Sequence, residues 1–153
     1  MVPASDPSQP KTVEWVGSSR DDLRKKPAEV QDSFGYALYQ AQLGLHHGSA
    51  KRLKGEFGGL VEVVDDFDGS AYRAVYTAKI AGVVYVLHVF QKKSKRGIAT
   101  PRQELAMIRR RWKEAKHRNA IHYRQIEIES SEMIEECSAR CTHNDYTNYQ
   151  PPG

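Results

Sequence analysis

The alternation of hydrophobic and polar positions divides the first third of the chain into a short strand and two helices. From Thr12 to Val16 apolar and polar side chains alternate, which is the two-residue period of a half-buried strand. The stretch from Ser19 to Lys25 fits a short helix. A second helix begins near Pro27, which suits a first helical turn, and ends before Gly44, a common stop residue. The pattern therefore predicts a strand followed by a helical hairpin.

The middle of the chain changes to the pattern of strands. Three segments rich in β-branched and aromatic residues follow one another: Leu60–Val64, Ala71–Ala78 and Val83–Phe90. Turn-forming pairs separate them, Asp68-Gly69 before the second strand and Ala81-Gly82 before the third. Because such short connections join neighbouring strands in opposite directions, we expect a three-stranded antiparallel meander.

Helical spacing returns from Pro101 to Arg118. One side of this segment is apolar, and the other carries five cations: Arg109, Arg110, Arg111, Lys113 and Lys116. Residues 119–153 form an acidic extension, in which a further helix would place four residues on one side before the chain frays: Ile126, Met133, Cys137 and Cys141. The coarse order is β, αα, βββ, α and then the extension. We therefore expect an α+β fold with helices packed on one antiparallel sheet.

Length and composition favour one folded domain over residues 11–118. The first ten residues, with three prolines and two serines, are typical of a disordered lead-in. No signal peptide is visible, and the longest apolar run, Val83–Phe90, is too short to cross a bilayer, so we expect a cytoplasmic protein without a membrane segment. Cys137 and Cys141 lack a second ligand pair at a recognisable spacing, so they indicate reduced thiols and no metal site.

Basic and acidic residues are unevenly distributed along the chain. The acidic extension carries two arginines against six carboxylates, a net charge of −4, while the whole chain carries +4, so the rest is close to +8. An excess of Lys and Arg favours a polyanionic partner, because each neutralised phosphate releases condensed counterions. A solvated basic face would give the same composition, and charge alone leaves both interpretations open.

The cations of the predicted sheet gather where its strands begin and end. They precede the meander, lie within it or follow its last strand: Lys51, Arg52, Lys54, Arg73, Lys92, Lys93, Lys95 and Arg96. Strand ends of a meander converge on one edge, so these side chains could form a groove for an RNA backbone. Four residues are candidates to stack on bases: Tyr72, Tyr76, Tyr85 and His88. Tyr85 alternates out of phase with His88, so both face one groove only if a bulge intervenes.

Eight short segments stand in a recognisable order over residues 12–117. They are Val13-Glu14-Trp15-Val16, Gly35-Tyr36-Ala37-Leu38, Gln42-Leu43-Gly44, Ala50-Lys51-Arg52-Leu53-Lys54-Gly55, Val61-Glu62-Val63, Tyr72-Arg73-Ala74-Val75-Tyr76, the run from Tyr85 to Ser94, and the run from Lys95 to Pro101. With these segments the chain resembles the HigB-like, phage-related branch of the RelE/ParE toxin superfamily. The acidic extension lies outside the resemblance.

The resemblance implies a compact microbial RNase fold, a ribosome-dependent attack on mRNA, and neutralisation by a helix-turn-helix antitoxin. A heterotetramer of toxin and antitoxin is one assembly that it allows. Such cleavage needs no cofactor, because the neighbouring 2′-hydroxyl of the RNA is the nucleophile. The protein must help to remove that proton, stabilise a crowded phosphorane and protonate the departing oxygen. Positioning and charge stabilisation can dominate such a reaction.

Each candidate residue has a role that its chemistry suits. Arg73 is the leading candidate for holding the phosphate, because its planar fork can donate two hydrogen bonds to adjacent oxygens. Lys92 or Lys93 could clamp the phosphate or transfer a proton. His88 suits acid–base work near neutral pH, although its strand position also fits a buried structural residue. The expected RNA-binding residues are Lys51, Arg52, Lys54, Tyr72, Tyr85, Lys95 and Arg96.

One position departs from the wider superfamily. Familiar RelE-type toxins carry lysines on the strand that corresponds to Leu60–Val64, where this chain has Glu62 and no cation. Glu62 is either a general base or a partner of Arg73 or a lysine across the sheet, and we favour the pair. Two other functions stay open: a ParE-like inhibitor that binds gyrase without chemistry, and a non-catalytic RNA- or partner-binding module regulated by its acidic extension.

Overall fold

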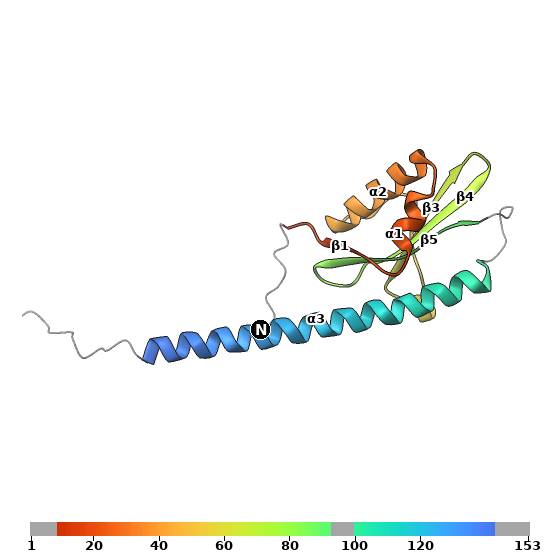
Figure 1. Cartoon of the computed structure of the whole chain (residues 1–153). Helices are drawn as coiled ribbons and strands as arrows, with labels where there is room; N and C mark the ends of the chain where they lie inside the picture. The colour runs from red at the N-terminus through yellow and green to blue at the C-terminus, as the bar shows by residue number, and fades with distance from the viewer. Residues whose placement is uncertain (1–8, 93–99, 143–153) are drawn as a thin grey trace, which may run out of the picture. The chain divides into compact units, whose positions relative to one another are not determined.

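The computed structural model describes residues 9–92 and 100–142, with side chains described as far as residue 136 (Figure 1). The chain divides into two compact units, one ending at Lys116 and one beginning at His117. The predicted lead-in and the final ten residues therefore lie almost entirely outside the described part. None of the helices in the described ranges is long and apolar enough to cross a membrane.

The first unit is an α+β fold, as predicted. Its elements are β1 (Thr12–Trp15), α1 (Ser19–Arg24), α2 (Ala28–Gln42), β2 (Ala50–Arg52), the 3-10 turn η1 (Gly55–Phe57), β3 (Leu60–Phe67), β4 (Ser70–Thr77), β5 (Val83–Lys92) and the first turns of α3 (Arg102–Thr142). The five strands form one sheet in the order β1-β5-β4-β3-β2. β1 runs parallel to β5, and the other neighbours are antiparallel, so the sheet is mixed and not wholly antiparallel as predicted. The helical hairpin and the meander are thereby confirmed.

The tight turn between β3 and β4 sets the register of the meander. Asp68 and Gly69 have φ angles of +48° and +75°, the left-handed conformation that a two-residue hairpin turn requires. β3 and β4 pair without interruption from Leu60 opposite Thr77 to Phe67 opposite Ser70. β3 ends at Phe67 and β5 at Lys92, beyond the predicted ends at Val64 and Phe90. Pairing with the neighbouring strands continues each strand past its last clearly alternating position.

The short edge strand β2 was not predicted. Its three residues pair with β3, Ala50 opposite Val63 and Arg52 opposite Val61. Two of its three side chains are charged and exposed, so no hydrophobic alternation marks it. Lysine and arginine on an edge strand discourage pairing with another sheet.

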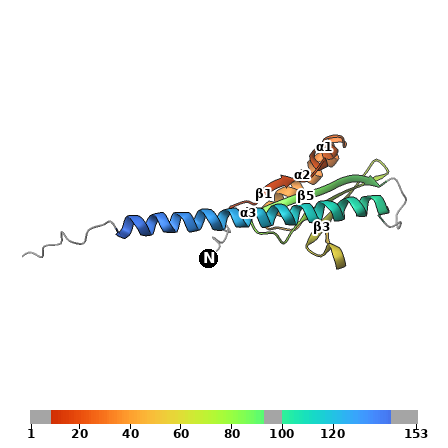
Figure 2. The ribbon, with the colours of Figure 1, turned by 60° about the horizontal axis from the view of Figure 1, so that its bottom comes forward.

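Helices cover both faces of the sheet (Figures 1 and 2). Each face has its own core of buried side chains. On one face α2 contributes Val30, Phe34, Ala37 and Leu38, which pack on valines of β3 and β5. On the other face α3 contributes Ile108 and Ala115, which pack with Leu60, Val75, Leu87 and Phe90. Burying each large side chain fully stabilises the fold by about 1.5–3 kcal/mol.

α3 is one continuous helix of 41 residues, from Arg102 to Thr142. The predicted division between a basic helix ending at Arg118 and a separate acidic helix is therefore wrong. Neither glycine nor proline occurs between Pro101 and Pro151, so no residue stops the helix where its charge changes sign. In the second unit the helix carries four exposed large apolar residues: Ile121, Ile128, Met133 and Ile134.

Candidate functional site

The sheet face toward α3 carries an arginine paired with a carboxylate. Arg73 Nη1 donates a hydrogen bond to Glu62 Oε1 at 2.6 Å. The two residues are diagonal neighbours, because Glu62 lies opposite Val75 and Arg73 lies opposite Val64. Their side chains are only 20% and 14% exposed. The predicted pair is thus present, and it holds the guanidinium in one orientation on the sheet.

One donor of Arg73 has no partner among the described residues. Its Nε is buried and forms no hydrogen bond within the described part of the chain. A buried donor without a partner costs roughly 1–3 kcal/mol, so native proteins rarely keep one without a reason. The arrangement leaves the guanidinium with hydrogen-bonding capacity beyond Glu62, which an oxyanion could use.

Three further candidate residues share this side of the sheet. Lys51 lies directly opposite Glu62 and is exposed. Lys92 lies opposite Ala71 and two residues after Phe90. Phe90 packs in the core on the α3 side, so Lys92 points to the same side, where it is largely buried. We use the term Arg73 face for this set: Lys51, Glu62, Arg73, His88 and Lys92. Side chains of directly paired and alternating residues point to the same face of a sheet, so the strand registers bring the set together.

A bulge decides how His88 is oriented. The register between β4 and β5 shifts between Val75 and Tyr76, so Val75 pairs with His88 while Tyr76 pairs with Val86. The extra residue puts Tyr85, Leu87 and His88 all on the α3 side, which the sequence allowed only if a bulge intervened. Tyr85 is nevertheless buried in the core there, and Tyr72 is buried in the core on the opposite face. Neither ring presents a surface for base stacking, which corrects that part of the prediction.

His88 belongs to a buried polar network with α3. Arg111 donates to Nδ1 of His88 at 3.1 Å and to the Leu87 carbonyl at 2.9 Å. Because Nδ1 accepts, Nε2 carries the hydrogen and donates it to Glu104. Both ring nitrogens therefore have partners, as expected for a structural histidine.

Arg111 reaches beyond the histidine to the first helix. Its Nη2 donates to Ser18 Oγ at 2.8 Å, and the guanidinium lies directly against Gly17. A Cβ at Gly17 would stand 2.8 Å from Arg111 Nε, and Gly17 has a φ of +59°, so only glycine fits. Burial lowers the pKa of the Arg111 guanidinium, and the charge of Arg110 acts in the same direction.

The sequence pattern missed this network because Arg111 was assigned to the polar side of the helix. It lies seven residues after Glu104 and between Ile108 and Ala115 at helical spacing, so it belongs to the stripe that faces the sheet. That spacing was the available signal. Lys54 and Arg52 are exposed near the edge strand. Lys93, Lys95 and Arg96 lie outside the described residues, and the described residues hold no group of three or more metal-ligating side chains.

A comparison with family models finds one match. Residues 21–113, more than half of the chain, match the family described as phage-derived protein Gp49-like. The chain belongs to the Gp49-like family. This family is of the RelE-like toxin type, which confirms the broad resemblance, whereas the HigB-like branch stays a prediction. The matched range of this Gp49-like protein contains the Arg73 face and Arg111.

Similarity to individual proteins is more distant. The toxin–antitoxin complex RelBE2 from Mycobacterium tuberculosis has a chain with 23% sequence identity and a TM-score of 0.39. The alignment covers 54% of this chain and 99% of that one. A likeness of this size assigns no site. No curated protein matches the sequence.

Proposed function

We propose that this Gp49-like protein is the toxin of a type II toxin–antitoxin pair and that it cleaves mRNA on the ribosome. The observation that carries the proposal is Arg73, which Glu62 holds on a sheet face with Lys51 and Lys92. Its buried Nε has no partner in the part of the chain that the structure describes. A guanidinium so held is suited to a phosphate, since its fork matches two adjacent oxygens. Family membership supports the toxin class.

The proposed reaction is attack by a 2′-hydroxyl on the adjacent phosphate. The new bond joins the 2′-oxygen to phosphorus, the bond to the 5′-oxygen breaks, one proton leaves the 2′-hydroxyl and one is delivered to the 5′-oxygen. The products carry a 2′,3′-cyclic phosphate and a 5′-hydroxyl. Arg73 would stabilise the charge that develops on the phosphorane, where preorganised donors contribute most. Lys92 and Lys93 are the proposed clamp or proton donor.

Glu62 has two possible roles in this reaction. Its hydrogen bond to Arg73 supports a positioning role, in which it aims the guanidinium. As a carboxylate next to the bound phosphate, it could also accept the 2′-proton. His88 is proposed as a structural residue, because Arg111 and Glu104 occupy both ring nitrogens. Lys51, Lys54, Lys95 and Arg96 would attract the RNA backbone.

The proposed partners follow from the toxin class. A helix-turn-helix antitoxin would neutralise the protein, with a toxin–antitoxin heterotetramer as one assembly, and the ribosome would present the mRNA. The proposed site of action is the cytoplasm, where translation takes place.

The test is induced expression of the wild type, Arg73→Ala and the control Arg20→Ala, an exposed arginine of α1. Messenger RNA 5′ ends and plasmid supercoiling are measured in the same cultures. We expect new mRNA 5′ ends in cells that express the wild type or the control, and none in cells that express Arg73→Ala. Intact mRNA with altered supercoiling would assign the protein to gyrase inhibition instead. No effect on either would leave a non-catalytic binding module.

A further inference from the structure

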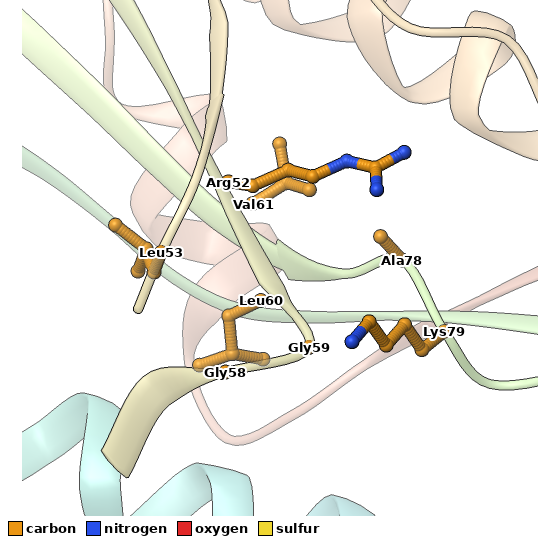
Figure 3. A pocket seen from close by; sticks show the side chains of 8 residues that line it. All are labelled: Arg52, Leu53, Gly58, Gly59, Leu60, Val61, Ala78 and Lys79. Carbon is orange, nitrogen blue, oxygen red and sulfur yellow. The ribbon is translucent and has the colours of Figure 1, made fainter. Parts of the chain in front are cut away.

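A small hollow opens at the end of the sheet where β2, β3 and β4 meet (Figure 3). It has a volume of about 150 Å³. Its apolar wall is formed by Leu53, Leu60, Val61 and Ala78. Sites for whole drug-sized molecules are usually about 300–1,000 Å³, so this hollow suits one chemical group of a larger ligand.

Two cations flank the hollow. The Arg52 side chain and the Lys79 side chain extend along it on either side of Ala78 (Figure 3). Neither forms an ion pair within the described part of the chain. None of the lining residues is acidic. Two carboxylates lie close to lining residues in sequence, and both have partners: Glu62 accepts a hydrogen bond from Arg73, and Glu56 accepts two from Arg109, at 2.9 and 2.7 Å.

Part of the backbone around the hollow is already hydrogen-bonded. Leu53 donates its N–H to the Leu60 carbonyl at 2.9 Å, and Ala78 donates to the Gly59 carbonyl at 3.0 Å. These hydrogen bonds hold the ends of β2, β3 and β4 together. The polar side chains of the lining are Arg52 and Lys79, which can only donate hydrogen bonds to a ligand. The ligand that fits is an anion with an adjoining apolar part.

A nucleotide of single-stranded RNA has this chemistry. Its phosphate offers several oxygens, which suits the planar fork of Arg52 together with the point charge of Lys79. Its base offers an apolar face to the aliphatic wall. A carboxylate side chain of a peptide has two oxygens and a smaller apolar part, so it would use less of the hollow.

The strand register connects the hollow to the Arg73 face. Lys51 lies opposite Glu62, on the same side of the sheet as Arg73, whereas Arg52 lies opposite Val61 and points to the other side. Adjacent residues of β2 thus present one cation to each side of this edge. An RNA strand that passes over the edge would meet both in succession.

We infer that the hollow between Arg52 and Lys79 binds one nucleotide of the RNA, at a distance along the strand from the phosphate proposed to lie at Arg73. This inference rests on the proposed function for the position of that nucleotide, but the binding itself does not require cleavage. The subsite would fix the register of the RNA on the protein and contribute to its sequence preference.

The experiment measures binding of the full-length protein to a fluorescent oligoribonucleotide with 2′-O-methyl groups at every position, which the proposed reaction cannot cleave. Affinity is followed against salt for the wild type, Arg52→Gln, Lys79→Gln and Ala78→Glu. Lys113→Gln, an exposed lysine of α3, is the matched control for loss of one charge. Circular dichroism checks that each variant is folded.

We expect Arg52→Gln and Lys79→Gln each to weaken binding about tenfold. Each should also reduce the slope of log K against log salt by about 0.7, which is the contribution of one phosphate contact on a single strand. Ala78→Glu should weaken binding at least as much, since it keeps both cations but adds a carboxylate to the wall. Uridine monophosphate should compete more strongly than inorganic phosphate, because only the nucleotide has a base for the apolar wall.

Wild-type affinity in Arg52→Gln and Lys79→Gln, or a loss no larger than that of Lys113→Gln, would overturn the inference. Competition by an acidic peptide but not by uridine monophosphate would overturn it in favour of a protein ligand. Failure of the proposed function looks different. In that case the wild type does not cleave unmodified mRNA on ribosomes, while binding of the methylated oligonucleotide still depends on Arg52 and Lys79.

Discussion

Arg73 donates to Glu62 at 2.6 Å across two strands, although the residues are diagonal neighbours rather than a direct cross-strand pair. The offset directs the guanidinium along the sheet face, and its buried Nε forms no hydrogen bond within the described residues. The pair thus combines an anchor with unused hydrogen-bonding capacity. This relationship is what the proposed role of Arg73 in binding phosphate requires, and it differs from that of a solvated surface arginine.

Substitutions of Glu62 should separate its two proposed roles. Glu62→Gln keeps an acceptor for Arg73, so we expect most cleavage activity to remain if the residue acts by positioning. Glu62→Ala should lower the free energy of unfolding by about 1–2 kcal/mol and reduce cleavage strongly, because a charge-assisted hydrogen bond is lost. Urea denaturation and the pH dependence of the cleavage rate check this. A glutamine variant as inactive as the alanine variant, with normal stability, would make Glu62 the general base.

The network around His88 should matter for stability and not for chemistry. Arg111→Met removes the donor to the Leu87 carbonyl and to Nδ1 of His88, leaving buried acceptors unpaired. We expect a loss of roughly 3 kcal/mol in the free energy of unfolding. His88→Gln should lower the free energy of unfolding by less than this. Both variants, where folded, should cleave RNA at the wild-type rate at low temperature. A stable His88→Gln protein without cleavage activity would instead make His88 a catalytic residue.

Tyr76 should make the fold sensitive to alkali. Burial raises the pKa of its hydroxyl to about 12 from an ordinary value of 10.0. Between these values the folded state holds a proton that the unfolded chain releases, so stability is intact below pH 10 and falls as the pH rises toward 12. The shift corresponds to a loss of about 2–3 kcal/mol. Tyr76→Phe should flatten this part of the stability profile, measured by urea denaturation, and an unchanged slope would contradict the assignment.

The acidic extension should be dispensable for folding of the first unit. Among the described residues, the last buried hydrophobic side chain is Ala115, so a chain ending at Arg118 keeps the whole core. We expect its thermal midpoint to stay within a few degrees of the full-length value. Because residues 119–153 carry a net charge of −4, their removal should also tighten nonspecific RNA binding and steepen its salt dependence. Unchanged salt-dependent affinity would show that the extension does not screen the basic face.

The sequence pattern predicted most elements of the first unit because they have local signals. Pro27 and Gly44 bracket α2, and Asp68-Gly69 forms the turn between β3 and β4. The edge strand β2 has no such signal, since only pairing with β3 makes its three residues a strand. The continuity of α3 was missed because a change of charge was taken for a boundary that no helix-stopping residue marks.

The site was predicted less completely than the fold. The pairing of Glu62 with Arg73 was expected from their chemistry, but its diagonal geometry depends on strand register. Tyr85 and His88 reached the same side through a bulge, which alternation along one strand cannot reveal. The hollow beside Lys79 required three strand ends to converge, so no single segment of sequence contained it.

The chemical nature of the RNA ends tests the central claim most directly. Translating ribosomes are incubated with mRNA and either the wild-type protein or Arg73→Ala, and the new ends are ligated with and without prior treatment by polynucleotide kinase. The account predicts 5′-hydroxyl ends that need the kinase, matched by 2′,3′-cyclic phosphates, and their absence with Arg73→Ala. New ends that carry 5′-phosphates, or ends that persist in Arg73→Ala, would contradict cleavage by 2′-hydroxyl attack at Arg73.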